Sequence, residues 1–356
     1  MEKLGLVGLA NSGKSTLYNA LTLSSTAVAP HAFSTTESVV GDAIVPDRRL
    51  DRLAELHSSR KRVYAHIQVA DVAGLVSGSS SGAGLGNRFL GQIREVDGIV
   101  YVLRAFSDPM VPGDDDPVSN LETLELELAL ADLASLEAII DRRRRTARVD
   151  RSLQPEVEAM QAARDLLAAG TPIYRSSLPA EARELLRNAF LLTDKTVLAV
   201  INVGEEEGSS AEAEAEVAAR LGGGVVVSAP LKLEEELIKL PQEERAEMME
   251  ALGVERPALE RIAEAAYAAL GRWTFFTTGD KESHAWTFRA GSNAVACAGA
   301  IHSDLARGFI RAEVIFWQEL VEIGSWTKAK AAGKLRLEGK DYLVADGDVL
   351  EIRFNV

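Results

Sequence analysis

The stretch from Gly8 to Thr16, Gly-Leu-Ala-Asn-Ser-Gly-Lys-Ser-Thr, constrains the fold of this chain more than any other feature. It fits the pattern G-x-x-x-x-G-K-[ST], follows the short apolar run Leu4–Val7 and precedes a helical pattern. Glycines at these positions let backbone N–H groups converge on phosphate oxygens, and the following helix adds the positive end of its dipole. The stretch therefore predicts a phosphate-binding loop and a nucleoside triphosphate ligand. A chance glycine turn beside a lysine is the weaker interpretation, because a strand and a helix flank the loop.

The side chains of this loop have distinct expected roles. Lys14 supplies a point charge to the β- and γ-phosphates, and the Ser15 hydroxyl is a ligand for Mg²⁺. Asn11 is also compatible with the use of a potassium-like cation. The expected nucleotide contacts in the loop are Gly8, Asn11, Ser12, Gly13, Lys14, Ser15 and Thr16.

Two further segments carry the features of a nucleotide switch. Asp71-Val72-Ala73-Gly74 follows an apolar run about 55 residues after the phosphate loop. Its carboxylate is expected to reach the Mg²⁺ shell through water, and the Gly74 N–H to meet the γ-phosphate. Between the two motifs, Thr35 is expected to complete the Mg²⁺ shell only while the γ-phosphate is present, and we prefer it to Thr36. The alternative is an ordinary Ser/Thr-rich loop.

Base recognition is expected where the apolar run Val197–Ile201 ends, at Asn202-Val203-Gly204-Glu205. The usual guanine-reading pattern at such a place is Asn-Lys-x-Asp, whose aspartate accepts two hydrogen bonds from guanine. Here Val203 replaces the lysine, and Glu205 is one methylene longer than the aspartate, so the feature that excludes ATP is missing. The expected base-side residues are Asn202, Val203, Glu205, Ser228 and Ala229.

Short β-branched runs alternate with helical stretches in the first part of the chain, as in a mainly parallel sheet buried on both faces. The pattern predicts a doubly wound α/β sheet in a P-loop NTPase domain formed by residues 1–119 and 189–272. The expected strands are Leu4–Leu9, Val63–Ala70, Ile99–Leu103, Val197–Ile201 and Val225–Val227. The expected helices are Lys14–Thr22, Gly86–Val96 and Ala211–Leu221.

An insertion at residues 120–188 has apolar residues at helical spacing in two arms, which predicts an antiparallel α-helical hairpin. Arg142–Arg145 are expected at its turn, with Arg148 and Arg151 nearby. One interpretation is a solvated charge run at a helix C-terminus, where cations are favoured. The other is a phosphate-contacting tip on a projecting arm. The sequence alone leaves both open.

Residues 273–356 differ from the rest of the chain. They contain short strand-like segments separated by glycines, and one helical pattern, Ala294–Ala306, lies between them. A small mixed sheet with one packing helix, similar to a β-grasp module, is the expected fold. Asp346-Gly347-Asp348 predicts a tight turn between the last two strands. The expected strands are Ala285–Phe288, Ala312–Ile315, Lys334–Leu337, Tyr342–Val344 and Val349–Phe354.

The composition excludes several classes of protein. The net charge of −14 argues against general affinity for nucleic acid, so any contact with RNA must use local patches. A single cysteine, Cys297, excludes an internal disulfide, and it predicts a buried inert thiol rather than a redox sensor. No apolar run is long enough for a membrane helix and no signal segment precedes the first strand, so a cytoplasmic protein is expected.

These motifs, in this order, resemble the YchF / Obg-like ATPase family of translation-factor-related P-loop proteins over essentially the whole chain. Further similar stretches are Pro46–Leu50, Gly84–Asn87, Ala312–Val314 and Lys334–Tyr342. The resemblance implies a G-domain-like core, a helical-hairpin insertion and a C-terminal TGS domain of β-grasp fold. It also implies a preference for ATP over GTP and association with ribosomes.

Leu75 bears on the mechanism, because many related switches have a glutamine there that orients the attacking water. Leucine has no donor or acceptor, so we expect slow intrinsic turnover. A potassium-like cation, another group or a partner must then complete the site. Family members often carry a histidine in the loop after Ile99–Leu103, but Ser107 to Asp116 contain none, which argues against a histidine-based mechanism from that loop.

The leading hypothesis is an ATP-hydrolysing switch that requires Mg²⁺ and acts on the ribosome. A second is a GTPase of the Obg type that tolerates ATP. A third is a ribosome- or RNA-binding adaptor, with the arginine tip and the C-terminal module as contacts and hydrolysis incidental.

Overall fold

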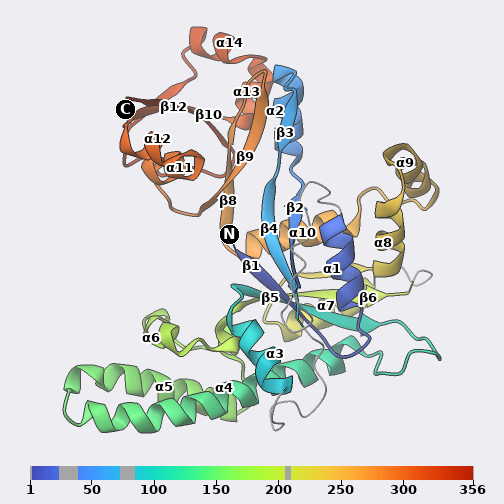
Figure 1. The fold of residues 1–356 in the computed structure, drawn as a ribbon, viewed down its shortest axis with the longest axis vertical. Coiled ribbons are helices and arrows are strands. Elements are labelled where there is room, and N and C mark those ends of the chain that lie inside the picture. Colours follow the sequence, from blue (N-terminus) through green and yellow to red (C-terminus); the bar gives the residue numbers. More distant parts are fainter. Residues whose placement is uncertain (1, 24–38, 73–84, 205–209, 356) are drawn as a thin grey trace. The chain divides into compact units, whose positions relative to one another are not determined.

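The computed structural model describes residues 2–23, 39–72, 85–204 and 210–355. The chain forms two compact units (Figure 1). The first unit comprises Met1–Ala43 and Gln68–Ala266, and the second comprises Ile44–Ile67 and Tyr267–Val356. Residues 44–67 therefore belong with the C-terminal part of the chain, whereas the sequence predicts them within the P-loop domain.

The first unit is built on a six-stranded sheet of order β2-β4-β1-β5-β6-β7. Strand β1 pairs in parallel with both β4 and β5, and β5, β6 and β7 continue in parallel. All five expected strands of this sheet are confirmed, and the edge strand β2 is an addition. The bounds are β1 (Lys3–Val7), β2 (Val39–Val45), β4 (Ala65–Asp71), β5 (Gly98–Ala105), β6 (Thr196–Val203) and β7 (Val226–Ala229).

In this order β2 and β4 lie on one side of β1, and the later strands β5, β6 and β7 lie on the other side. The loop after β1 therefore opens at a switch point of the sheet. Ligands of doubly wound folds bind at this point, outside the carboxyl ends of the strands. The three expected helices of the sheet are confirmed, and α8 packs on α1. The helices are α1 (Lys14–Leu23), α3 (Leu85–Arg94), α7 (Ala211–Arg220), α8 (Leu231–Lys239), α9 (Gln242–Ala251) and α10 (Ala258–Ala269).

The insertion forms the expected antiparallel hairpin, from α4 (Pro117–Ala147) and α5 (Gln154–Ala168). Its own apolar core joins the two arms, with Leu136 and Ile140 of α4 packed among residues of α5. The turn lies at residues 148–153, so Arg142–Arg145 belong to the last turns of α4 and not to the turn itself. The remaining short elements are 3-10 turns at Arg151–Leu153, Ile173–Arg175, Arg187–Ala189 and Leu192–Asp194, and helix α6 (Ala180–Leu186).

A buried carboxylate fastens the base of the hairpin to the first unit. Asp132 of α4 is fully buried and accepts hydrogen bonds from the backbone of Leu192 and Thr193 and from the Thr193 hydroxyl, at 3.0, 2.8 and 2.7 Å. Burial raises the pKa of this carboxyl, and the three hydrogen bonds oppose that shift. The hairpin is thus held at its base as well as along its length.

The second unit contains a six-stranded mixed sheet of order β11-β10-β12-β8-β9-β3. β8 and β9 form an antiparallel hairpin, β10 is antiparallel to β12, and β12 is parallel to β8. The expected mixed sheet with a packing helix, α11, is confirmed. The strands are β3 (Lys61–Val63), β8 (Arg272–Thr277), β9 (Glu282–Arg289), β10 (Phe309–Phe316), β11 (Arg336–Glu338) and β12 (Asp348–Phe354). The helices are α2 (Arg48–His57), α11 (Ala294–Ile301), α12 (Ser303–Arg307), α13 (Trp317–Ile323) and α14 (Trp326–Ala331).

Three details of the second unit differ from expectation. Tyr342–Val344 forms no strand, and only a single bridge pairs Leu343 with Asn293. The tight turn therefore precedes β12 alone, with Gly347 at a φ of 95° that favours glycine. The helical pattern is interrupted at His302, which separates α11 from α12.

Arg49 shows why residues 44–67 belong to the second unit. Its guanidinium forms ion pairs with Asp47 at 2.8 Å and with Asp346 at 2.7 Å, and it lies 5.2 Å from the centre of the Phe276 ring. Asp346 in turn accepts a hydrogen bond from the Thr274 N–H at 2.8 Å. Together with the parallel pairing of β3 and β9, these contacts join a segment early in the chain to the C-terminal sheet.

No helix among the residues that the structure describes is long and apolar enough to cross a membrane.

Candidate nucleotide-binding site

The backbone of the loop after β1 requires its two glycines. Gly13 has a φ of 100°, and a Cβ at this position would lie 2.4 Å from the side-chain nitrogen of Asn202. A Cβ at Gly8 would lie 2.5 Å from both the Ser12 hydroxyl and the Val102 carbonyl oxygen. Asn11 also takes a left-handed conformation, with a φ of 63°. The loop therefore curls as a phosphate-binding loop does.

Lys14, the first residue of α1, spans this loop. Its ammonium group donates to the carbonyl oxygens of Gly8 at 3.0 Å and Leu9 at 2.7 Å, and the residue is 8% exposed. Burial lowers the pKa of Lys14, while the nearby Asp71 carboxylate opposes the shift. An anionic phosphate in the loop would compensate the buried charge, as expected for this lysine.

Ser15 and Asp71 bring two oxygen atoms that can ligate a metal ion together, close to the carboxyl ends of β1 and β4. The Ser15 hydroxyl donates to a carboxylate oxygen of Asp71 at 2.9 Å. No group of three or more acidic, histidine or cysteine side chains that could hold a metal ion occurs among the described residues. A hydroxyl and one carboxylate fit Mg²⁺, which keeps several waters and shares phosphate oxygens rather than using an all-protein cage. The third expected ligand, Thr35, lies outside the described residues, as do Gly74 and Leu75.

Asn202 connects the base side of the site to the phosphate loop. Its amide donates to the Ser12 carbonyl at 3.1 Å and accepts from the Leu231 N–H, the first residue of α8, at 3.3 Å. This buried side chain therefore holds β6, the phosphate loop and α8 in register. Val203 follows it at the edge of the cavity, and Glu205 lies outside the described residues.

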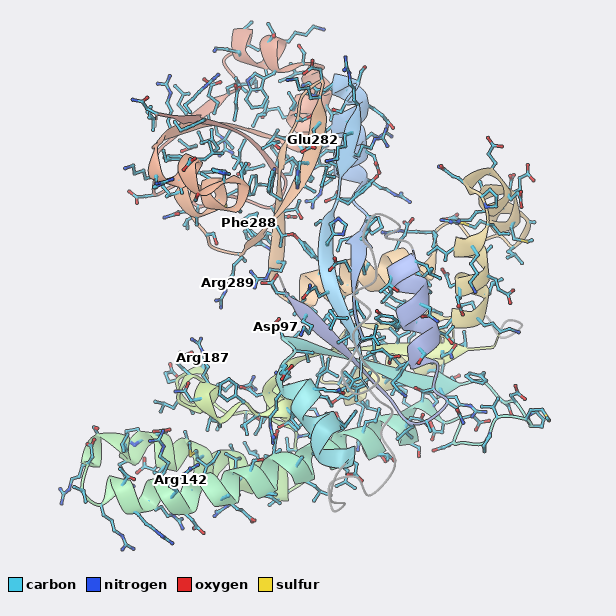
Figure 2. The ribbon with its side chains drawn as sticks, viewed as in Figure 1. Asp97, Arg142, Arg187, Glu282, Phe288 and Arg289 are labelled. Atoms are coloured by element: carbon cyan, nitrogen blue, oxygen red, sulfur yellow. The ribbon has the colours of Figure 1, made fainter. Side chains whose placement is uncertain are left out.

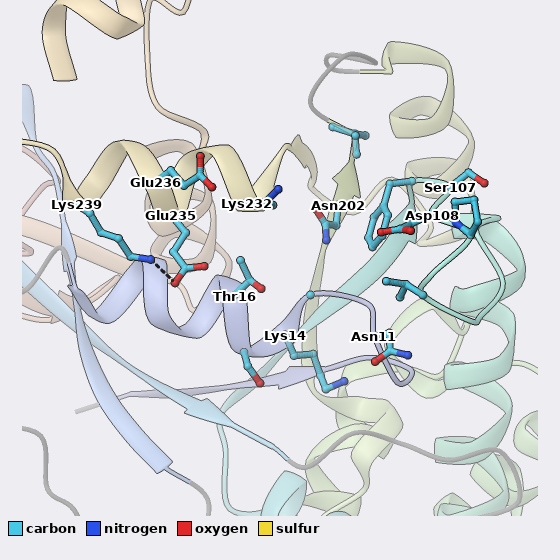
Figure 3. A pocket seen from close by; sticks show the side chains of 17 residues that line it. Asn11, Lys14, Thr16, Ser107, Asp108, Asn202, Lys232, Glu235, Glu236 and Lys239 are labelled. Carbon is cyan, nitrogen blue, oxygen red and sulfur yellow. Dashed lines mark hydrogen bonds and ion pairs between the residues drawn. The ribbon is translucent and has the colours of Figure 1, made fainter. Parts of the chain in front are cut away.

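A cavity of about 1080 Å³ opens over the loop (Figure 3), large enough for a nucleotide, since ligand pockets commonly measure about 300–1,000 Å³. Five of the seven expected loop residues line it; Gly8 and Ser12 do not. The other walls come from the segment after β5, the end of β6 and helix α8. The lining residues are Asn11, Gly13, Lys14, Ser15, Thr16, Phe106, Ser107, Asp108, Pro109, Val111, Asn202, Val203, Gly204, Lys232, Glu235, Glu236 and Lys239.

Ser228 and Ala229, the expected second base-side segment, are buried in β7 and do not line this cavity. The Ser228 N–H donates to a carboxylate oxygen of Glu214 at 2.7 Å. The residues after β7 that do face the cavity lie on α8, where Lys239 pairs with Glu235 at 3.0 Å. Contact of Ser228 and Ala229 with a base therefore stays a prediction.

The segment after β5 forms a wall that sequence reasoning missed. Arg104 is 3% exposed and donates to the carbonyl oxygens of Phe106 at 2.9 Å and Val111 at 3.0 Å. Its guanidinium lies 4.4 Å from the centre of the Phe106 ring. The Asn11 side chain reaches this wall by donating to the Pro112 carbonyl at 3.3 Å. An arginine directly after the buried run Ile99–Leu103 was the one signal available in the sequence.

Comparisons with known proteins agree with this geometry. A family model described as a 50S ribosome-binding GTPase matches residues 3–135. The model for the C-terminal region of YchF GTPases, described as a protein of unknown function, matches residues 273–355. A Bacillus subtilis protein named Ribosome-binding ATPase YchF is 41% identical over 361 residues, which cover 99% of each chain. The chain belongs to the YchF family.

Two other YchF proteins extend the comparison. The Ribosome-binding ATPase YchF of Haemophilus influenzae is 41% identical and covers 99% of each chain. The solved structure of the Schizosaccharomyces pombe YchF GTPase superposes with a TM-score of 0.87 at 30% identity, covering 99% of this chain and 97% of that one. The α/β P-loop fold and a nucleoside triphosphatase activity are therefore confirmed for this YchF chain.

Proposed function

We propose that the protein is an Mg²⁺-dependent ATPase with slow intrinsic turnover, which acts as a nucleotide switch on the ribosome. The observation that carries the proposal is the phosphate cradle of Gly8, Gly13 and Lys14 beside the Ser15–Asp71 oxygen pair. It occurs in a chain that aligns along its length with proteins named ribosome-binding ATPases.

In this proposal each group of the site has one task. Lys14 and the loop N–H groups bind the phosphates, while Ser15, Thr35 and, through water, Asp71 hold Mg²⁺. The ion neutralises charge on the β- and γ-phosphates when bound. The Gly74 N–H contacts the γ-phosphate. Leu75 offers no group to orient the attacking water, so a partner or a potassium-like cation near Asn11 raises the turnover.

The preference for ATP is the finer part of the proposal. Val203 and Glu205 lack the lysine and the aspartate that select guanine, which favours a permissive purine site. The name of the fission yeast relative, a YchF GTPase, supports the alternative that GTP is the substrate. Competition between ATP and GTP for the same site separates the two. A clear preference for GTP would reverse the assignment.

The ribosome is the proposed partner, and this role implies a cytoplasmic location. Ribosomal RNA is the proposed contact for the Arg142–Arg145 region and for a C-terminal TGS domain, residues 273–356. The other proposed divisions are a P-loop domain, residues 1–119 with 189–272, and the inserted hairpin, 120–188. In the structure residues 44–67 pack with the C-terminal part.

The decisive experiment measures hydrolysis and ribosome co-sedimentation in one preparation, with ATP or ADP and with or without potassium. We expect ribosomes and potassium to raise the ATP turnover, and the sedimented fraction to depend on the nucleotide. Binding that is strong but indifferent to the nucleotide, with no stimulation, would favour the adaptor alternative.

A further inference from the structure

The far end of the α4–α5 hairpin carries a dense cluster of positive charge. Six of the ten residues from 142 to 151 are arginines, in a chain whose net charge is −14. Figure 2 shows Arg142 on α4, toward the end of the hairpin that lies away from the sheet of the first unit. The charge is therefore local, in an otherwise acidic protein.

Two of these arginines serve the hairpin itself. Arg143 forms an ion pair with Glu156 of α5 at 3.3 Å. With its amide oxygen facing α4, Gln161 accepts hydrogen bonds from Arg144 at 2.6 and 2.9 Å. These contacts fasten the end of α4 to α5 and account for the middle pair of the run.

The other four have no such role. They are Arg142, Arg145, Arg148 and Arg151, defined here as the arginine surface. All four are exposed, and none forms an ion pair within the part of the chain that the structure describes. Asp150, the carboxylate among them, is held by the Ser152 N–H and hydroxyl at 3.0 and 2.6 Å.

The helix dipole explains only part of this surface. Cations gain from the dipole only near the last turn of a helix, and the basic residues in the last turn of α4 are Arg144 and Arg145. Arg142 precedes that turn, Arg148 is the C-cap residue, and Arg151 lies beyond the helix in the 3-10 turn. Like charges three residues apart, such as Arg142 and Arg145, disfavour the helix. The dipole therefore favours Arg145 and the C-cap Arg148, and it leaves Arg142 and Arg151 without an explanation inside the hairpin.

The chemistry of the surface selects a polyanion with phosphate groups. All its cations are arginines, whose planar forks bind phosphate through two parallel hydrogen bonds. A lipid surface would require an apolar anchor as well. Between residues 141 and 156, Val149 is the single exposed large apolar side chain. The hairpin core and the buried Asp132 hold the surface on a stiff arm.

We propose that the arginine surface docks on the phosphate backbone of RNA, and that it supplies a salt-dependent part of the affinity for the ribosome. The proposal rests on the ribosome as the partner, and it names the residues of the hairpin that make the contact. Recognition is by phosphate and therefore independent of sequence.

The test compares two triple variants of the full chain that remove the same number of positive charges. In the first, Arg142→Gln, Arg145→Gln and Arg148→Gln empty most of the surface while keeping good helix formers. The control has Arg164→Gln, Arg187→Gln and Arg220→Gln, which remove paired arginines elsewhere in the first unit, the first half-buried and the other two exposed. Their partners are Asp165, Glu184 and Glu122.

Binding to ribosomes and to a short RNA duplex is measured over a range of salt concentrations, with ATP hydrolysis as the check of the intact fold. We expect the surface variant to bind ribosomes and duplex about 10- to 100-fold more weakly at low salt. Its slope of log affinity against log salt should fall by about 2 to 3, because each lost phosphate contact removes about 0.7 to 0.9. The control should match the wild-type protein.

Each remaining outcome has a separate meaning. Equal affinity and slope for the surface variant and the wild type would overturn the inference and leave the proposed function standing. Loss of ribosome binding with unchanged duplex binding would also overturn it, because the contact would then be an acidic protein. Failure of the wild-type protein to bind ribosomes at all would instead refute the proposed function.

Discussion

At the scale of single residues, Lys14 holds a charge that its surroundings do not favour. It donates to two carbonyl oxygens of its own loop, yet burial lowers its pKa, so an entering phosphate gains a strong partner. Charge-assisted hydrogen bonds of this kind contribute about 1.5–3 kcal/mol.

Replacement of Lys14 by alanine should therefore weaken ATP binding by about 10- to 100-fold and abolish measurable hydrolysis. Titration calorimetry and phosphate release measure the two effects. Lys239→Ala is the matched control, because Lys239 lines the same cavity but is paired with Glu235. Unchanged turnover in Lys14→Ala would refute the assignment of the loop.

Cys297 illustrates how a residue's neighbours decide its chemistry. It is fully buried, and burial, assisted by the Asp348 carboxylate, raises its pKa to about 12. The thiolate is the reactive form, so iodoacetamide at pH 8 should leave the folded protein unmodified and label it once urea unfolds it. Mass spectrometry follows the label. Rapid labelling of the folded chain would revive the redox interpretation.

At the scale of elements, the sequence predicted best what depends on neighbouring residues. The strands of the parallel sheet are continuous apolar runs, and the phosphate loop is a complete motif, so both were recognised. β2 was missed because Gly41 and Asp42 interrupt its pattern. The placement of α2 and β3 could not be predicted, because their partners lie more than 200 residues away.

The wall after β5 also could not be predicted from the sequence, because it forms only when the chain folds back on Arg104. Arg104→Lys keeps the charge but loses the fork that holds two carbonyl oxygens. We expect a loss of unfolding free energy of about 2 kcal/mol and an ATP affinity about 10-fold lower, with little change in turnover once the site is saturated. Urea unfolding and saturation kinetics measure these quantities.

The control for that variant is Arg220→Lys, whose side chain forms a surface pair with Glu122. Surface pairs contribute about 0–1 kcal/mol, so this change should be almost silent. If Arg104→Lys were equally silent, the wall would not depend on the guanidinium.

At the scale of the whole molecule, the second unit is made of two pieces of chain. A fragment ending at Ala266 would keep α2 and β3 without their partners and expose Leu50 and Leu53, both fully buried in the intact protein. We expect such a fragment to aggregate or bind the apolar dye ANS. Replacing residues 46–64 by a short Gly/Ser linker should prevent the aggregation and the ANS binding. The linker can be short because β2 and β4 are neighbours in the sheet.

The two fragments are compared by light scattering and by ATP binding. If the fragment that ends at Ala266 and keeps residues 46–64 were soluble and monomeric, residues 44–67 would not need the C-terminal sheet to cover their apolar side chains.

The same division has a consequence in time. Lys61 of β3 contacts Glu282 of β9 across 221 residues of chain. At a synthesis rate of about 5–20 residues per second, about 10–45 s separate the emergence of the two partners. Through most of translation, the nascent chain therefore contains the strand β3 with an unpaired edge and the helix α2 with an uncovered face.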